Sequence, residues 1–583
     1  MNQSFRNNFT NPKLNSILNI SKIVIISISA LYLLGNFSPF YDGQDSYLYG
    51  IESIFLSQGI YEISNPLLQE TGRVEFTGGN WNPTIHGTLI PIAGIGTPLL
   101  GAIAYTIGGN FGLFYLAPIL GIVLLIVYER VITKLFGKSI GFLALLFFAT
   151  CHIFFRSSIH LNTDAILTLF FVLGILFLVK FFRNEKTYYI LLASIFFSIC
   201  CLVKITALVF FPLEFALLFS YFVIPIIKNK LSGSNHSYST YFHKNNKKLI
   251  QMFVLATIPW ILFFGFWFGY NDYFYGSPTS TYFSVVTGGE YTTATRIDSL
   301  LTLEQRDYDQ AKDYSKYLLP YQISAVYNKI NNNFDDVLGK NWPGLLILPL
   351  ILLSLYLSFK QKLHRLEFSI FTIFIFGIVG FYSGQTPEWR AELGLPSRYM
   401  LPAITLSFVM CSFLIVRLYD VIKQNTRISF FKIPLILFLT AFFIFAFTFS
   451  PPIQFLVTND DFTNPIEANE KYSIAKENLP PKSVILAQNI DMVIEYGVTP
   501  FRLDGVNTWN SEKISLLTKV LDKGYSVYIF KTPTAFDEKE SLLHIINEHN
   551  VILKDYSKTF CQLHIDNKTM SSDDSCLYQN LKS

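Results

Sequence analysis

The sequence is poor in charge and rich in apolar residues. Only 15% of its 583 residues are charged, whereas 51% are apolar and 16% are aromatic. This composition, with its positive mean hydropathy, excludes an ordinary soluble enzyme and indicates a polytopic membrane protein. The net charge of +4 is spread over loops rather than gathered on one face, which argues against nucleic acid as a partner.

Several sequence signals are also missing. The chain has no glycine-rich phosphate loop, no histidine or cysteine cluster with metal-binding spacing and no convincing internal repeat. These absences count against an ATP-driven pump and against a repeat-built secondary transporter. No metal site is assigned and no cofactor is required, although a divalent metal stays an option. The first apolar run, roughly 17–34, lacks a small-residue cleavage site and is expected to stay as an anchor.

The long apolar runs predict an all-α membrane fold. With the first run they make eleven candidate spans, each long enough to cross a bilayer. The further ten lie at roughly 111–130, 139–157, 164–182, 187–204, 205–227, 249–270, 343–359, 367–383, 399–417 and 433–450.

The run 87–108 is ambiguous because it is long enough to span but is broken by Pro91, Pro98 and several glycines. The distribution of basic residues decides between the two readings. If this run does not span, the basic clusters at 130–138, 183–186, 228–248, 360–365 and 417–432 fall on the same side as Arg6 and Lys13. We therefore expect an interfacial or re-entrant helix at 87–108 and a cytoplasmic amino terminus.

This topology predicts two domains. Residues 1–450 form the transmembrane module, with a first outer loop at 37–110 and a large outer loop at 271–341. Residues 451–583 have a different composition and predict a small extracytoplasmic α/β domain. A Cys561–Cys576 disulfide in this domain is left open. The outer side belongs to a plasma membrane or, in a eukaryote, to an endoplasmic reticulum.

The acidic stretch after the first span is the leading candidate for chemistry. In a helix starting after Gly43, Asp45, Tyr49 and Glu52 fall at i, i+4 and i+7, on one face. Asp45, with Asp42 beside it, is the candidate general base. The alternative is a solvated turn in which Asp42 and Asp45 only begin a short helix as N-terminal anions.

Asp164 is a second outer acid, at the start of the span 164–182. An acid there is costly unless it meets water or a partner, which favours a function. The alternative is a helix cap supplied by Asn162, Thr163 or Asp164. The two interpretations are compatible.

Cations at the outer ends of spans are candidates for binding a phosphate. Arg398 is the sharpest because it begins a span beside Tyr399 and can contact a phosphate with two N–H groups. Lys204 is second, and Arg156 and Arg390 are further candidates. Each could instead extend to the lipid headgroups. His86, before the broken run, could contact a metal or a phosphate, but a lone histidine is more often structural.

The order of these motifs resembles the GT-C superfamily of integral-membrane glycosyltransferases. The resemblance covers about the first 450 residues and is nearest to the protein O-mannosyltransferases and the lipid A aminoarabinose transferase. Two positions depart from the pattern: Asp45-Ser46 replaces an Asp-Glu pair, and His86-Gly-Thr replaces a basic residue followed by Pro-Pro. The matching segments are Asp45-Ser-Tyr-Leu-Tyr49, the helix beginning Gly96-Thr-Pro, Asn162-Thr-Asp164, Phe274-Tyr-Gly-Ser-Pro278 and Ser397-Arg-Tyr-Met-Leu-Pro402.

The resemblance implies a polyprenyl- or dolichyl-phosphate sugar donor and a protein, lipid or glycan acceptor. Asp45 would act as the base of an inverting transfer, and Arg398 and Lys204 would stabilise the leaving phosphate. An oligosaccharide transferase or lipid-glycan ligase with a diphosphate donor is one alternative. A lipid-linked-sugar transporter or flippase is another, and for that function Glu214, an acid within an apolar run, would matter more than Asp45.

Overall fold

The protein was analysed as a computed structural model. The description covers residues 12–40, 44–71, 81–91, 94–231, 238–278, 342–385, 396–424, 450–453, 463–475, 479–480, 482–487, 499–502, 511–530, 551–555 and 560–565. Among the predicted features, Asp42, Arg390, Cys576, nearly all of the run 433–450 and most of the large outer loop lie outside these residues.

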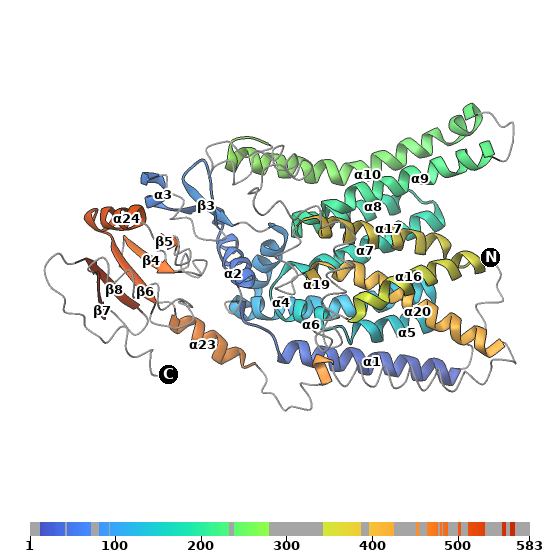
Figure 1. Ribbon diagram of the computed structural model, residues 1–583, viewed down its shortest axis with the longest axis horizontal. Coiled ribbons are helices and arrows are strands. Elements are labelled where there is room, and N and C mark those ends of the chain that lie inside the picture. Colours follow the sequence, from blue (N-terminus) through green and yellow to red (C-terminus); the bar gives the residue numbers. More distant parts are fainter. Residues whose placement is uncertain are drawn as a thin grey trace.

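Most of the described chain is a bundle of helices that run along the long axis of the molecule (Figure 1). Among the described residues, five helices are long and apolar enough to cross a membrane, or six if one bent pair counts as a span. The predicted mostly helical fold is confirmed, whereas the total of eleven spans stays a prediction. The helices are α1 (Pro12–Gly35), α4 (Gly96–Phe136), α5 (Lys138–Phe148), α6 (His152–Ile159), α7 (Thr163–Asn184), α8 (Tyr188–Val203), α9 (Phe210–Leu231), α10 (Tyr238–Tyr275), α16 (Trp342–Gln361), α17 (Arg365–Gln385) and α20 (Leu401–Gln424).

Two of the predicted runs are not single straight helices. The run 139–157 is divided between α5 and α6, which are bent by 66° at a short break. The run 205–227 begins with a 3-10 turn, η4 (Ile205–Val209), before α9. In both places the apolar composition continues through the break, so composition alone does not reveal the change in backbone direction.

The ambiguous run 87–108 is also not one helix. Thr88–Pro91 is strand β3, and helix α4 begins only at Gly96. The helix then turns sharply at Gly109, where φ is 56° and ψ is −142°. The two arms pack closely, since a Cβ added at Gly112 would lie 2.0 Å from the Ala104 carbonyl oxygen. Glycine supplies both the positive φ and the close approach.

The first outer loop forms a small core of its own at one end of the bundle. Helix α2 (Gln44–Ser57) buries Tyr47, Leu48, Ile51 and Ile54, whose spacing makes one apolar stripe. This stripe packs in a cluster that includes Phe114 of α4. The loop also holds helix α3 (Pro66–Thr71) and an antiparallel sheet, in the order β1-β3-β2, of β1 (Ile63–Ser64), β2 (Trp81–Pro83) and β3.

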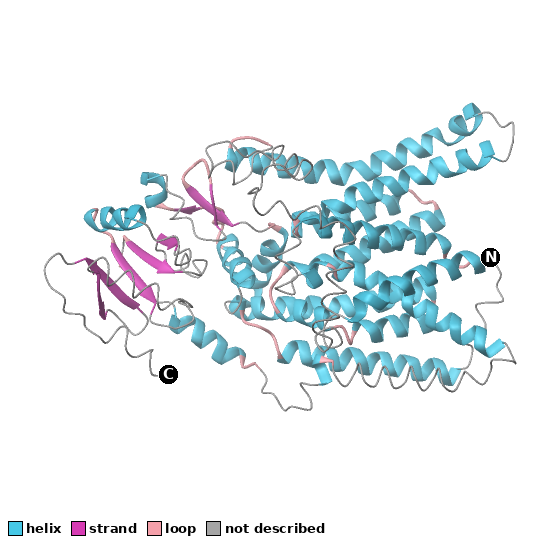
Figure 2. Cartoon of the chain, viewed as in Figure 1, coloured by secondary structure: helices cyan, strands magenta, loops and turns pink. Residues whose placement is uncertain are grey.

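The tail contains a five-stranded mixed sheet, which lies beyond the same end of the bundle (Figure 2). Strand β4 is parallel to both β5 and β6, whereas β8 is antiparallel to β6 and β7, giving the order β5-β4-β6-β8-β7. The predicted domain boundary at residue 450 stays a prediction. The elements are α23 (Pro465–Ala475), β4 (Ser483–Ala487), β5 (Thr499–Arg502), α24 (Ser511–Asp522), β6 (Ser526–Phe530), β7 (Val551–Asp555) and β8 (Phe560–Ile565).

Helix α23 contacts the core of the first outer loop. The Thr463 amide donates to the Gly35 carbonyl oxygen at 2.8 Å, and Asn110 Nδ2 donates to Asn469 Oδ1 at 2.8 Å. Ala468 is buried in the same cluster as the apolar stripe of α2. The tail is therefore joined to the loop that carries Asp45.

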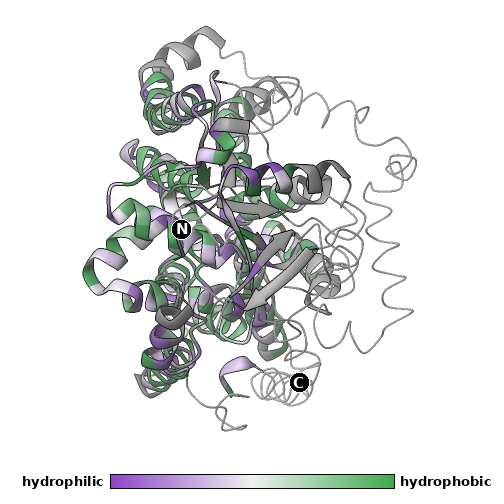
Figure 3. Cartoon of the chain, turned by 90° about the vertical axis from the view of Figure 1, so that its left-hand side faces the viewer, coloured by the Kyte–Doolittle hydropathy of each residue, from purple (hydrophilic) through white to green (hydrophobic). Residues whose placement is uncertain are grey.

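Buried polar contacts join the helices inside the bundle and at its other end. Glu214 of α9 accepts hydrogen bonds from Ser194 Oγ of α8 at 2.7 Å and from Trp260 Nε1 of α10 at 2.9 Å. Far along α7, Arg183 forms an ion pair with Glu367 of α17 and donates to a backbone oxygen near the end of α4. Viewed along the helices from the end with the sheets, hydrophobic residues predominate in the bundle (Figure 3).

Candidate active site

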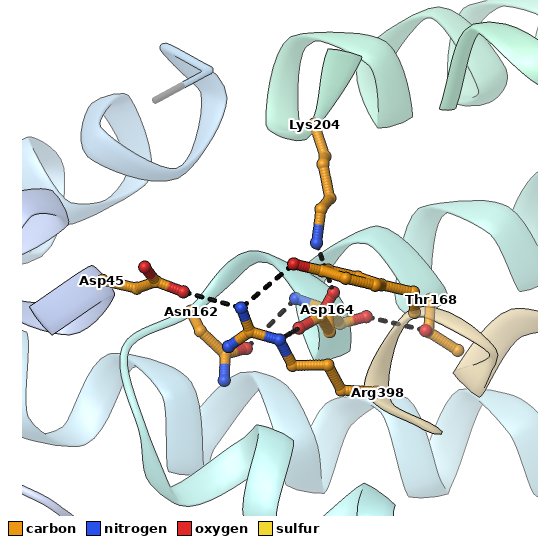
Figure 4. Close-up of polar contacts among 7 residues, drawn as sticks. Asp45, Asn162, Asp164, Thr168, Lys204 and Arg398 are labelled. Carbon is orange, nitrogen blue, oxygen red and sulfur yellow. Dashed lines mark hydrogen bonds and ion pairs between the residues drawn. The ribbon is translucent and has the colours of Figure 1, made fainter. Parts of the chain in front are cut away.

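Four charged side chains meet at the end of the bundle that faces the first outer loop (Figure 4). Asp45 comes from the first turn of α2, Asp164 from the first turn of α7, and Lys204 from the junction between α8 and η4. Arg398 comes from the short helix α19 (Pro396–Tyr399), which precedes α20. The four residues thus come from four different parts of the chain.

Asp164 is the buried centre of this cluster. Its side chain is 4% exposed, and its Oδ1 accepts from Lys204 Nζ at 2.8 Å while its Oδ2 lies 3.6 Å from Arg398 Nε. The helix cap is supplied by Asn162, whose Oδ1 accepts from the Asp164 amide at 3.1 Å. The cap and the ion pairs therefore coexist, because Asn162 leaves the Asp164 carboxylate free for the two cations.

Lys204 reaches Asp164 because the backbone leaves the helix at this residue. Its φ of −153° and ψ of 116° are extended, and they end α8 before the 3-10 turn begins. The ammonium nitrogen lies 3.6 Å from the centroid of the Tyr399 ring. Lys204 is thus held both by a carboxylate and by the face of an aromatic ring.

Arg398 bridges the two acids. Its Nη2 donates to Asp45 Oδ2 at 2.8 Å and to the Tyr399 hydroxyl at 3.1 Å, while its Nε faces Asp164. Burial lowers the pKa of Arg398, but Asp164, Tyr399 and Asp45 together outweigh this effect and raise it above its ordinary value. The guanidinium therefore stays charged.

Tyr49 lies beside the two acids, one helical turn after Asp45. Burial raises the pKa of the Tyr49 hydroxyl, and the negative charges of Asp45 and Asp164 raise it further. The hydroxyl is hydrogen-bonded to the Thr163 side chain. Tyr49 is therefore a neutral hydrogen-bonding group that connects α2 with the start of α7.

Glu52, the third member of the predicted acidic face, is placed differently from Asp45. It is buried, and its Oε2 has no hydrogen-bond partner among the residues that the structure describes. Burial holds its pKa well above the ordinary value, because burial disfavours the charged form of the carboxyl.

His160 is a residue of this region that the sequence interpretation did not select. Burial lowers its pKa, and the positive charges of Arg156 and Arg398 lower it further. Arg156 itself is exposed on the last turn of α6, near His160. In the sequence, His160 could have been selected only by its place directly before Leu161 and Asn162, of which Asn162 caps α7.

His86 contacts a different element. Its Nε2 lies 3.0 Å from the Tyr273 carbonyl oxygen, and its ring is 5.1 Å from the Tyr273 ring. These contacts attach the β2–β3 hairpin to the end of α10. The structural interpretation of this histidine is therefore the one that its contacts favour.

The cluster combines a half-exposed carboxylate with two cations. The Asp45 side chain is 47% exposed, whereas those of Arg398 and Lys204 are 28% and 18% exposed. Such an arrangement can accept a proton at Asp45 and stabilise an anion beside the cations. Among the residues that the structure describes, no three His, Cys, Asp or Glu side chains gather as a metal site.

Comparison with solved structures identifies the fold. The archaeal oligosaccharyltransferase AglB from Archaeoglobus fulgidus, in complex with an inhibitory peptide and a dolichol-phosphate, superposes with a TM-score of 0.53 at 14% identity, over 94% of this chain and 74% of that chain. The apo form of the A. fulgidus oligosaccharyltransferase gives 0.52 at 14% identity, over 88% and 70%. The fold is of the GT-C type.

Further comparisons were made with families and with individual proteins. The family model of the dolichyl-phosphate-mannose-protein mannosyltransferases matches residues 96–241, a segment of the GT-C fold that contains Asp164 and Lys204. The resemblance predicted from the sequence is thus confirmed. Apo ArnT from Cupriavidus metallidurans is similar at 11% identity with a TM-score of 0.49, over 94% of this chain and 98% of that chain. No curated protein matches the sequence.

Proposed function

We propose that this chain is a membrane glycosyltransferase that moves a sugar from a polyprenyl- or dolichyl-phosphate donor to an acceptor. The observation that carries the proposal is the cluster in which Asp45 and Asp164 are bridged by Arg398 and accompanied by Lys204. The family match over 96–241 and the GT-C fold support the same reaction class. The acceptor is a hydroxyl or an amide of a protein, a lipid or a glycan.

The reaction is an inverting displacement. Asp45 takes the proton from the acceptor, and the acceptor atom forms a bond to the anomeric carbon. The bond between that carbon and the phosphate oxygen breaks, and the phosphate leaves with the electron pair. Arg398 and Lys204 stabilise the negative charge that the leaving phosphate gains.

The active site faces the extracytoplasmic side in this proposal. Arg183, in one predicted cytoplasmic basic cluster, contacts both the end of α4 and Glu367, which lies just after another such cluster. The positions of these groups at one end of the bundle fit the positive-inside rule. The acid-bearing helix α2 and the tail are at the opposite end (Figure 1), which supports an outer location for both.

Replacing Asp45 tests the role of the base directly. We expect Asp45→Asn to reduce transfer from a radiolabelled short-chain polyprenyl-phosphate sugar by at least about 100-fold, as loss of a general base does. The matched control is Glu52→Gln on the same helix, since Glu52 is buried without a described contact to the cluster and glutamine has nearly the same shape. The assay uses purified protein in detergent, with and without a chelator. Full activity of Asp45→Asn would rule out Asp45 as the base.

A second candidate is an oligosaccharide transferase that uses a diphosphate-linked donor. The similarity in fold to the A. fulgidus oligosaccharyltransferase supports this second candidate. The same assay separates the two functions when it is run with diphosphate-linked donors. Transfer from these alone, and not from the monophosphate-linked sugars, would replace the first proposal with the second.

A further inference from the structure

Arg398 presents two differently placed edges to its two acidic partners. Its Nε faces Asp164, whose side chain is 4% exposed, whereas its Nη2 faces Asp45, whose side chain is 47% exposed. The Tyr399 hydroxyl accepts from Nη2 as well. The inner contact is therefore enclosed by protein, while the outer contact opens towards the loop side.

The outer contact uses the atoms that a phosphate would need. A guanidinium binds a carboxylate and a phosphate through the same N–H groups and in the same planar geometry. A phosphate placed beside Lys204 and Arg398 would thus meet an Nη2 that already donates to Asp45 at 2.8 Å. The same N–H group cannot donate a full-strength hydrogen bond to the Asp45 carboxylate and to the phosphate at the same time.

The charges of the cluster also indicate that Asp45 and a bound phosphate compete. Asp45 and Asp164 balance Arg398 and Lys204, so the four side chains together are neutral. A phosphate beside the cations is attracted more strongly when one carboxylate moves away from them. Asp45 is the carboxylate that can move, because Asp164 is buried and contacts both cations.

We propose that Asp45 and the lipid phosphate of the donor compete for the outer edge of Arg398, so that donor binding releases Asp45 to act as the base. This inference rests on the proposed function. Asp164 and Tyr399 hold the guanidinium in place while its outer edge changes partner. The acceptor is then deprotonated only after the donor phosphate is bound.

Competition between Asp45 and the phosphate predicts tighter phosphate binding when Asp45 is neutralised, an effect that misfolding would not produce. Because binding is reciprocal, an acid that opposes phosphate binding must, when neutralised, improve it. We expect Asp45→Asn to bind farnesyl phosphate about two- to fivefold more tightly than wild type, the range for a partly exposed ion pair. A misfolded variant would bind more weakly, not more tightly.

The experiment is a double-mutant cycle on the full-length protein in detergent. Dissociation constants for farnesyl phosphate are measured by calorimetry for wild type, Asp45→Asn, Arg398→Ala and the double variant. In the Arg398→Ala background, Asp45→Asn should no longer improve binding, because the shared group is absent. Glu52→Gln is the matched control, since Glu52 has no contact with Arg398 among the described interactions and should leave affinity unchanged.

The outcomes separate this inference from the proposed function. Equal or weaker binding by Asp45→Asn, with wild type binding well, would overturn the competition and leave the glycosyltransferase proposal standing. The same gain in the Arg398→Ala background would also overturn it, because general electrostatic repulsion would then be the cause. No binding of farnesyl phosphate by wild type would overturn both proposals.

Discussion

Tyr399 serves both cations of the cluster with different parts of one side chain. Its hydroxyl accepts from Arg398 Nη2 at 3.1 Å, and its ring lies 3.6 Å from Lys204 Nζ. A phenylalanine would keep the second contact and lose the first. The residue therefore allows the contributions of the hydroxyl and the ring to be separated.

Substitutions of Tyr399 should weaken use of the donor in two steps. We expect Tyr399→Phe to raise the donor KM about threefold, the effect of one lost hydrogen bond. Tyr399→Leu should raise it about tenfold, because the cation–π contact with Lys204 is lost as well. Steady-state kinetics with varied donor measures both values. A leucine variant with the wild-type donor KM would mean that the ring does not hold the cations.

The individual candidates could be predicted from the sequence, but their pairings could not. Asp45, Asp164, Lys204 and Arg398 were recognisable as charged residues next to apolar runs. Their contacts depend on how distant helices pack, since Arg398 and Asp45 are 353 positions apart in the chain. Tyr399 as a support for both cations, and His160 beside them, follow only from that packing.

Glu214 connects three helices of the bundle. Ser194 of α8 and Trp260 of α10 each donate a hydrogen bond to a different oxygen of this carboxylate. A fully buried group with both oxygens engaged is suited to fixing helix positions. This arrangement is more typical of a structural contact than of a site on a transport path.

Replacing Glu214 should change stability without changing transfer. Glutamine keeps the shape but offers only one oxygen, so we expect Glu214→Gln to lose one interhelical bond and about 1 kcal/mol of unfolding free energy. Thermal melting of the purified protein and the transfer assay give the two values. Loss of function in Glu214→Gln, together with full function in Asp45→Asn, would instead favour a transporter.

The connection between α16 and α17 contains a pH-sensitive residue, His364. Its Nδ1 is 4.0 Å from Glu367 Oε2, and its ring packs against Phe136 at 4.8 Å. Burial lowers the pKa of His364 to about 4; Glu367 opposes this effect, whereas Arg183 and Arg417 add to it. The folded protein therefore holds this ring in its neutral form.

This shift predicts a loss of stability in acid. The contribution of His364 is complete above pH 6.5, its ordinary pKa, and is lost as the pH falls towards about 4, because the unfolded chain binds the proton first. The loss should reach about 2 to 3 kcal/mol. Melting temperatures of wild type and His364→Gln at pH 7 and pH 4.5 measure it. An equal acid-induced drop in both proteins would contradict the prediction.

Helices were predictable where an apolar run coincides with a regular backbone. The runs 164–182 and 249–270 lie within α7 and α10. The break between α5 and α6 was not predictable, because apolar residues continue on both sides of it and no proline or glycine marks it. Strand β3 was missed because Thr88–Pro91 joins an apolar run, while its pairing partners, β1 and β2, lie outside that run.

At the scale of the whole molecule, the tail and the first outer loop share one hydrophobic core. Ala468 of α23 packs in the cluster formed by α2, α4 and the segment after α1. On the same helix Ile466 is 61% exposed. The two residues therefore form a matched pair for testing the importance of this contact.

A charge at Ala468 should disrupt the loop core. We expect Ala468→Glu to destabilise this region by roughly 3 kcal/mol or more, the effect of an unpaired buried charge, and to reduce transfer strongly. Ile466→Glu should leave stability and transfer near wild type, because its side chain faces solvent. Thermal melting and the transfer assay distinguish the two. Equal behaviour of the two variants would mean that α23 does not support the active site.

The hydrogen bond between Asn110 and Asn469 joins positions 359 residues apart in the chain. Ribosomes make the first of these long before the second, so α2 and its neighbours are synthesised before α23 exists. The core that packs against α2 is completed only when the last fifth of the chain has been translated. A nascent chain therefore holds α2 and α4 for some time before α23 packs against them, and under the proposed function transfer begins only after that packing.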